Sequence, residues 1–105
     1  MAKARLTRAD VINRVKSAEM QIAGLGVRRL ALFGSVVRDE ARPDSDVDLL
    51  VEFEPARKTF DNFLALCELL ERLLDHTVEL VTIEALSPYI GPHILAEAQD
   101  VLRAA

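Results

Sequence analysis

Two short apolar runs, and the polar residues at their ends, constrain the fold of this 105-residue chain more than any other feature. The first run covers Val27 to Phe33 and stops at Gly34 and Ser35. The second run covers Val47 to Phe53. Runs of this length predict β-strands, and the glycine and serine predict a turn or short helix after the first strand. That turn suits anionic oxygens, because glycine permits close backbone approach and serine offers a hydroxyl and an amide.

Two aspartates, Asp46 and Asp48, stand at the start of the second strand. Strand side chains alternate between faces, so the two carboxylates share the face opposite to Val47. Like charges this close repel each other, and a cation between them removes the repulsion. Oxygen ligands of this kind suit a hard divalent ion such as Mg²⁺ or Mn²⁺. The alternative is that both aspartates only solvate the start of a strand, but the nearby turn at Gly34 and Ser35 favours the metal site.

A third carboxylate stands inside a third predicted strand, residues 77–82. Val78 and Leu80 face one side of this strand, whereas Glu79 faces the other side with Val81. A charged residue in a strand of such a small core is a local inconsistency that a functional site would explain. Glu79 is therefore our candidate for a third metal ligand.

Other segments have the spacing of helices. Thr7 caps a first predicted helix, which runs to Gly24. Residues 60–74 predict a helix whose apolar arc approaches half of its circumference, where a surface helix needs roughly 100°. That width indicates either deep burial in a small domain or contact of the helix edge with another protein. Pro92 fits the first position of a last helix that extends to Leu102.

Composition limits the classes of function. The net charge is −4 and no basic block is present, which argues against binding duplex nucleic acid through its phosphates. Hydrophobic residues make up 50% of the chain, which predicts one folded domain over residues 1–105. The single Cys67 cannot form an internal disulfide and fits the reducing cytoplasm. No apolar run approaches the roughly 20 residues that a membrane span needs.

The turn and the paired aspartates together form a compound motif. It reads Gly34-Ser35-x-x-Arg38 and then Ser45-Asp46-x-Asp48-Leu49. This motif resembles that of the minimal nucleotidyltransferase (MNT) family of the DNA polymerase beta superfamily. The resemblance covers roughly residues 27–102. It implies an α/β (α+β) fold in which helices flank a small mixed sheet of about three to four strands.

The resemblance also implies roles for individual residues. Family members usually have glycine where this chain has Asp39 and aspartate where it has Glu79, so both residues depart from the pattern. Arg38 could bind a phosphate, or it could brace the loop by pairing with Asp39, Asp44 or Asp46. For catalysis and for binding Mg²⁺ or Mn²⁺, the implied residues are Asp46, Asp48 and Glu79. For nucleotide binding, they are Gly34, Ser35 and Arg38.

Many members of this family resemble the antitoxin half of HEPN–MNT toxin–antitoxin pairs. The resemblance thus implies metal-dependent transfer of AMP from ATP to a hydroxyl, that of a tyrosine, on a cognate HEPN toxin within a hetero-oligomer. A second possibility is a non-catalytic antitoxin that inhibits its partner by contact, which Glu79 and the wide apolar helix favour. A third is transfer to RNA or to a small molecule such as an aminoglycoside. The absence of a second lobe and of basic surface argues against this third possibility.

Overall fold

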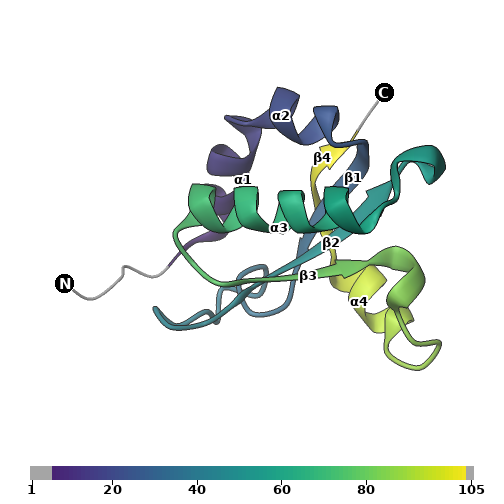
Figure 1. The fold of residues 1–105 in the computed structure, drawn as a ribbon. Coiled ribbons are helices and arrows are strands. Elements are labelled where there is room, and N and C mark those ends of the chain that lie inside the picture. The colour runs from purple at the N-terminus through teal and green to yellow at the C-terminus, as the bar shows by residue number, and fades with distance from the viewer. Residues whose placement is uncertain (1–5, 104–105) are drawn as a thin grey trace.

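A four-stranded mixed sheet forms the centre of the computed structural model, which describes residues 6–103 (Figure 1). Its strands are β1 (Val27–Phe33), β2 (Val47–Phe53), β3 (Val78–Thr82) and β4 (Gln99–Arg103). They lie in the order β3-β2-β1-β4. β1 is antiparallel to both β2 and β4, whereas β2 and β3 are parallel. The sheet confirms the predicted fold class; of the predicted domain, residues 1–5 and 104–105 lie outside the described residues.

Helices cover the two faces of the sheet unequally. The helices are α1 (Arg8–Lys16), α2 (Glu19–Gly24), α3 (Phe60–Leu74) and α4 (Gly91–Glu97). α1, α2 and α3 lie on one side of the sheet, and the short α4 lies on the other side near the end of β3 (Figure 1). The main hydrophobic core lies between the first three helices and the sheet. None of the helices in residues 6–103 is long and apolar enough to cross a membrane.

Alternation along β2 separates the core from the carboxylates. Val47, Leu49 and Val51 are at most 1% exposed and face the helical layer. Asp48 and Glu52 alternate with them and remain partly exposed. Because strand side chains point to opposite faces in turn, the acidic residues of β2 lie on the face that α1, α2 and α3 leave open.

The wide apolar arc of α3 is only partly covered. Leu66, Leu70 and Leu74 are fully buried, as expected for a helix that packs on a small sheet. Phe60 and Leu64, in the first turns, remain 75% and 45% exposed. Thr59 caps the helix by accepting a hydrogen bond from the Asn62 amide. The predicted bounds of this helix are confirmed. Deep burial explains the apolar residues of its later turns but not those of its N-terminal turns.

The first predicted helix is two helices, α1 and α2, rather than one. The Ser17 hydroxyl donates a hydrogen bond to the Arg14 carbonyl, and Ala18 leaves the helical conformation with φ −116° and ψ 24°. A serine side chain that bonds to a nearby backbone carbonyl competes with the helix, which explains the break. Val15 and Ile22 are nevertheless buried on the expected apolar face, since both short helices pack on the same core.

The prediction of a last helix that extends to Leu102 was wrong beyond Glu97. α4 stops there, Ala98 is extended, and residues 99–103 form β4 beside β1. Without β4, β1 would be an edge strand whose peptide groups lack partners, so strand pairing outweighs the helical spacing of the apolar residues. Val101 and Leu102, in β4, belong to the hydrophobic core at 5% and 9% exposure.

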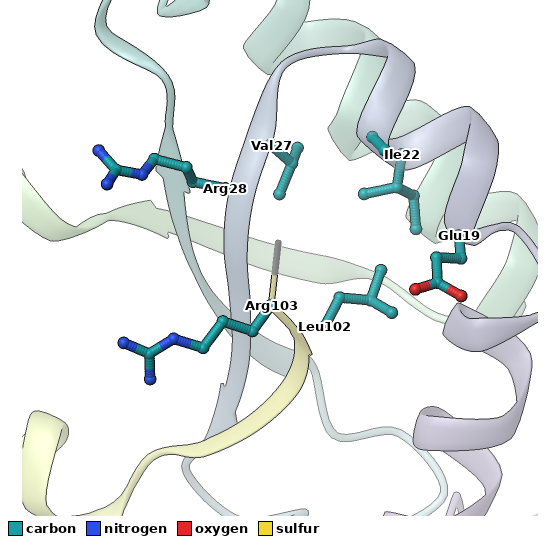
Figure 2. A pocket seen from close by; sticks show the side chains of 7 residues that line it. Glu19, Ile22, Val27, Arg28, Leu102 and Arg103 are labelled. Atoms are coloured by element: carbon teal, nitrogen blue, oxygen red, sulfur yellow. The ribbon is translucent and has the colours of Figure 1, made fainter. Parts of the chain in front are cut away.

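A small hollow of about 50 Å³ lies at the start of β1, between α2 and β4. Figure 2 shows Ile22, Val27 and Leu102 gathered on one side of the strand, while the guanidinium groups of Arg28 and Arg103 point away from them. The hollow is therefore apolar inside, with charged groups at its rim.

Candidate active site

The predicted carboxylates come from two neighbouring strands. Asp48 lies in β2 and Glu79 in β3, and the parallel register places these two residues side by side. Asp46 immediately precedes β2 and is exposed. Because Val47 and Val78 point into the core, the carboxylates lie on the opposite face of the sheet. The strand pairing thus brings Glu79 beside Asp48, although the two residues are far apart in the sequence.

Asp48 has the most informative electrostatic environment of the three. Its pKa is raised from 3.8 to about 6, first by burial, then by the charge of Glu79 and a hydrogen bond with it, and further by the charge of Asp46. The positive charge of Arg38 opposes this shift. The charge effects require the charged groups to lie near Asp48, so Glu79, Asp46 and Arg38 are all within electrostatic reach of this carboxyl group.

Gly34 makes the close approach of the turn to Asp48 possible. Phe33 is the β1 residue paired with Asp48, and Gly34 follows it with φ +77°. A Cβ atom on residue 34 would overlap Asp48 Oδ2 and would lie 3.0 Å from its Cγ. Only glycine satisfies both the positive φ and the lack of space, so this residue holds the turn against the carboxylate.

The segment after Gly34 is a series of turns, not a short helix. The Arg38 amide donates to the Gly34 carbonyl at 3.3 Å, and the Glu40 amide donates to the Ser35 carbonyl at 2.8 Å. Asp39 has φ +61°, the left-handed conformation that glycine adopts readily. Asp39 therefore departs from the family pattern in residue type while keeping a glycine-like backbone.

Arg38 braces the turn, but through two partners that were not predicted. Its Nη1 donates to Glu97 Oε1 at 2.5 Å, and its Nε donates to Glu40 Oε2 at 3.2 Å. These bonds, that to Glu97 above all, raise the pKa of Arg38. Glu97 belongs to α4, and no local signal in the sequence indicates that α4 ends beside this turn.

Ser45 fixes the turn that leads into β2, as the sequence indicated. Its hydroxyl accepts a hydrogen bond from the Arg42 amide at 2.8 Å, and its amide donates to the Arg42 carbonyl at 3.0 Å. A serine that bonds to the backbone within its own turn restricts the chain just before the strand. Ser45 thereby helps to set the position of Asp46.

The three carboxylates meet part of what a divalent metal ion needs. Within residues 6–103, no three His, Cys, Asp or Glu side chains are already arranged as a metal-binding group. The donor chemistry nevertheless fits a hard ion, because Asp46, Asp48 and Glu79 offer only oxygen ligands, and the pKa of Asp48 is raised by burial and then by the charges of Glu79 and Asp46. A side-chain rearrangement on cation binding would convert this repulsion into coordination.

Comparison with known proteins decides the family of the chain. The model of the nucleotidyltransferase domain family matches residues 12–101, which include every residue of the site. The chain belongs to the nucleotidyltransferase domain family. This confirms the resemblance that the turn and the paired aspartates indicated.

Relatives of this nucleotidyltransferase include named protein adenylyltransferases. It is 46% identical over 72 residues to protein adenylyltransferase MntA of Thermococcus cleftensis, across 69% of this chain and 72% of the relative. It is 39% identical over 77 residues to a proposed protein adenylyltransferase of Methanocaldococcus jannaschii, across 73% and 82% of the two chains.

Solved structures share the fold of this nucleotidyltransferase. A proposed minimal nucleotidyltransferase superposes with a TM-score of 0.78 at 37% identity, over 90% of this chain and 95% of that chain. A more distant match is a chain from the complex of a tri-AMPylated Shewanella oneidensis HEPN toxin with its MNT antitoxin. Its TM-score is 0.56 at 19% identity, over 85% of this chain and 72% of that chain, which shows likeness of fold.

Proposed function

We propose that this nucleotidyltransferase transfers AMP from ATP to a tyrosine hydroxyl of a cognate HEPN toxin, and so acts as its antitoxin. The observation that carries the proposal is the convergence of Asp46, Asp48 and Glu79 beside the Gly34 turn, with the pKa of Asp48 raised to about 6. Relatives named protein adenylyltransferase support the reaction, and the AMPylated HEPN toxin in complex with an MNT antitoxin supports the acceptor. The free Cys67 is consistent with a cytoplasmic location.

In the proposed reaction, the tyrosine oxygen attacks the α-phosphorus of ATP. The bond between this phosphorus and the oxygen that bridges to the β-phosphate breaks, so AMP is joined to tyrosine and pyrophosphate leaves. Glu79 accepts the proton of the hydroxyl, a role open to this carboxylate because it is exposed to an incoming acceptor. The backbone at Gly34 and the hydroxyl of Ser35 hold the departing pyrophosphate.

Asp46, Asp48 and Glu79 are the residues proposed to hold Mg²⁺ or Mn²⁺ with the nucleotide. A bound divalent ion supplies neutralisation of the negative charge that develops on the transferred phosphoryl group. Asp48 and Glu79 would hold the ion in a fixed position, because they belong to adjacent strands rather than to a loop. Glu79 is one methylene longer than the aspartate usual in the family, so it reaches further from β3.

Labelled ATP tests this proposal directly. The protein is incubated with Mg²⁺, ATP labelled on its α-phosphate and the purified HEPN protein encoded beside it. A double variant, Asp46→Ala with Asp48→Ala, is compared with Asp44→Ala, which removes an exposed carboxylate from the preceding turn. We expect label on the toxin with the wild type and with Asp44→Ala, and none with the double variant. Equal labelling by all three proteins would contradict the proposal.

A second function, inhibition of the toxin by contact alone, is favoured by one observation. Phe60 and Leu64 remain exposed at the start of α3, where a partner could cover them. The same experiment separates the two functions when toxin activity is measured beside the label. Inhibition by the double variant without label on the toxin would support contact inhibition.

A further inference from the structure

Arg38 is held by carboxylates from two different parts of the chain. Glu40 comes from the same turn, whereas Glu97 lies at the end of α4, 59 residues away in sequence. The Arg38 side chain is 50% exposed, but the Glu97 side chain is only 24% exposed. A long, exposed arginine normally samples many rotamers, so two simultaneous partners restrict it strongly.

The position of Glu97 follows from the pairing of β4 with β1. In this antiparallel pair Leu32 lies opposite Gln99. Chain directions are opposed, so Gly34, just after β1, and Glu97, just before β4, lie at the same end of this strand pair. The pairing of β4 with β1 therefore brings Glu97 to the turn that starts at Gly34.

The orientation of the guanidinium matters because its N–H donors point in fixed directions. Arginine has five N–H donors in a planar, rigid fork, and the bonds to Glu40 and Glu97 use one on Nε and one on Nη1. Fixing these two directions fixes the plane and the outer edge of the fork. The edge that carries Nη2 is then the part that can meet an anion.

We propose that Glu97 is a positioning residue that holds Arg38 in the orientation in which it binds a phosphate group of ATP. This proposal rests on the proposed function, since it requires ATP to be the substrate. Glu97 does not touch the nucleotide; it acts through Arg38. Without Glu97 the guanidinium retains its charge and loses its fixed orientation, so ATP binding must order the side chain again.

Calorimetric titration of the protein with Mg²⁺-ATP tests this role without any acceptor protein. We expect Glu97→Ala to raise the Kd for ATP about 3- to 10-fold, the range expected for one side chain that must be ordered on binding. Glu97→Gln keeps an oxygen that accepts from Nη1, so it should restore most of the affinity. The matched control is Glu84→Ala. It breaks a surface ion pair with Lys58 in the segment directly after β3 and should leave the Kd for ATP unchanged.

A double-variant cycle distinguishes positioning from a general structural effect. If Glu97 acts through Arg38, Glu97→Ala should have no further effect on the Kd in an Arg38→Ala background. A structural effect would persist there and would also lower the Tm. Should Glu97→Ala fail to fold, Glu97→Asp replaces it, because the shorter side chain cannot reach Arg38 in the same way.

Two results would overturn the role of Glu97. An unchanged Kd in Glu97→Ala would show that Glu40 alone orients the arginine, and a lower Kd would show that Glu97 competes with phosphate for it. Both leave the proposed function intact if the wild type still labels the toxin. Failure of the wild type to bind ATP would instead overturn the proposed function and, with it, this inference.

Discussion

The two ends of β1 hold charged side chains in opposite ways. At its C-terminal end, Gly34 contacts the Asp48 carboxylate, whose pKa is raised to about 6 by burial and by other carboxylates. At its N-terminal end, Arg28 points away from an apolar hollow that Ile22 and Leu102 help to line (Figure 2). A partly buried carboxylate that lies beside other carboxylates indicates a functional site, whereas solvated guanidinium groups at the rim of a hollow are stable without a ligand.

The largest expected difference between the two ends is in catalysis. Glu79→Gln removes a proton acceptor and a metal ligand, so we expect kcat/KM for AMP transfer to fall about 100- to 1,000-fold. Glu52→Gln is the matched control, because Glu52 lies further along β2 on the same face. Initial rates of label transfer to the toxin measure both variants. Equal rates for Glu79→Gln and Glu52→Gln would remove the distinction between the site and the rest of this face.

Next in size is the effect of adding a methyl group at Gly34. Gly34→Ala should lower the free energy of unfolding by about 2–4 kcal/mol, because φ is +77° and the new Cβ overlaps Asp48. Gly24→Ala, at the end of α2, meets no atom within 4 Å and should be neutral or stabilising by up to about 1 kcal/mol. Urea unfolding of both variants measures the difference. Equal stability of the two variants would show that Gly34 is not held against the carboxylate.

A smaller effect is expected in the pH dependence of stability. The folded-state pKa of Asp48 is about 6 and its ordinary value is 3.8, so its proton stabilises the folded chain below about pH 4. That stabilisation is lost as the pH rises through 6. Asp48 is partly solvated, and solvent screens its charge. The contribution of its pKa shift to the free energy of unfolding is therefore about 1 kcal/mol.

Comparison of the wild type with Asp48→Asn isolates this contribution. Asp10 and Glu84 have lowered pKa values and contribute the opposite slope in both proteins. We therefore expect the unfolding free energy of Asp48→Asn, minus that of the wild type, to rise between pH 4 and 6 in metal-free buffer. A difference that stays constant over this range would show that Asp48 titrates normally.

The smallest effect is expected at the N-terminal end of β1. Arg28→Ala should change the free energy of unfolding by less than about 0.5 kcal/mol, since the side chain is exposed and points away from the hollow. The rate of AMP transfer should stay at the wild-type level. A loss of transfer with Arg28→Ala would show that the rim of the hollow takes part in binding the nucleotide or the toxin.

Local patterns predicted most of the central elements. The bounds of β1, β2 and α3 match the predicted segments 27–33, 47–53 and 60–74, because apolar runs, turn residues and helical spacing are encoded within each segment. β4 was missed because strand pairing is a contact between distant segments. Val101 and Leu102 are compatible with either a helix or a strand, and only the open edge of β1 selects the strand.

For the site too, local sequence could indicate the residues but not the contacts between distant segments. The motif indicated Asp46 and Asp48, and alternation in the third strand indicated Glu79. The register that places Glu79 beside Asp48 comes from the parallel pairing of β2 and β3, which no single segment specifies. Glu97, one of the two partners of Arg38, was missed for the same reason, since the pairing of β4 with β1 brings it to the turn.

The most direct test of the account is the pKa of the Asp48 carboxyl, measured by carbon-13 NMR in the metal-free protein. We predict a value of about 6 in the wild type and a clearly lower value in Glu79→Gln, because the charge of Glu79 is removed. Saturating Mg²⁺ should lower the value in the wild type, since a cation favours the ionised form. A pKa near 3.8 that neither Glu79→Gln nor Mg²⁺ changes would contradict the convergence of these carboxylates.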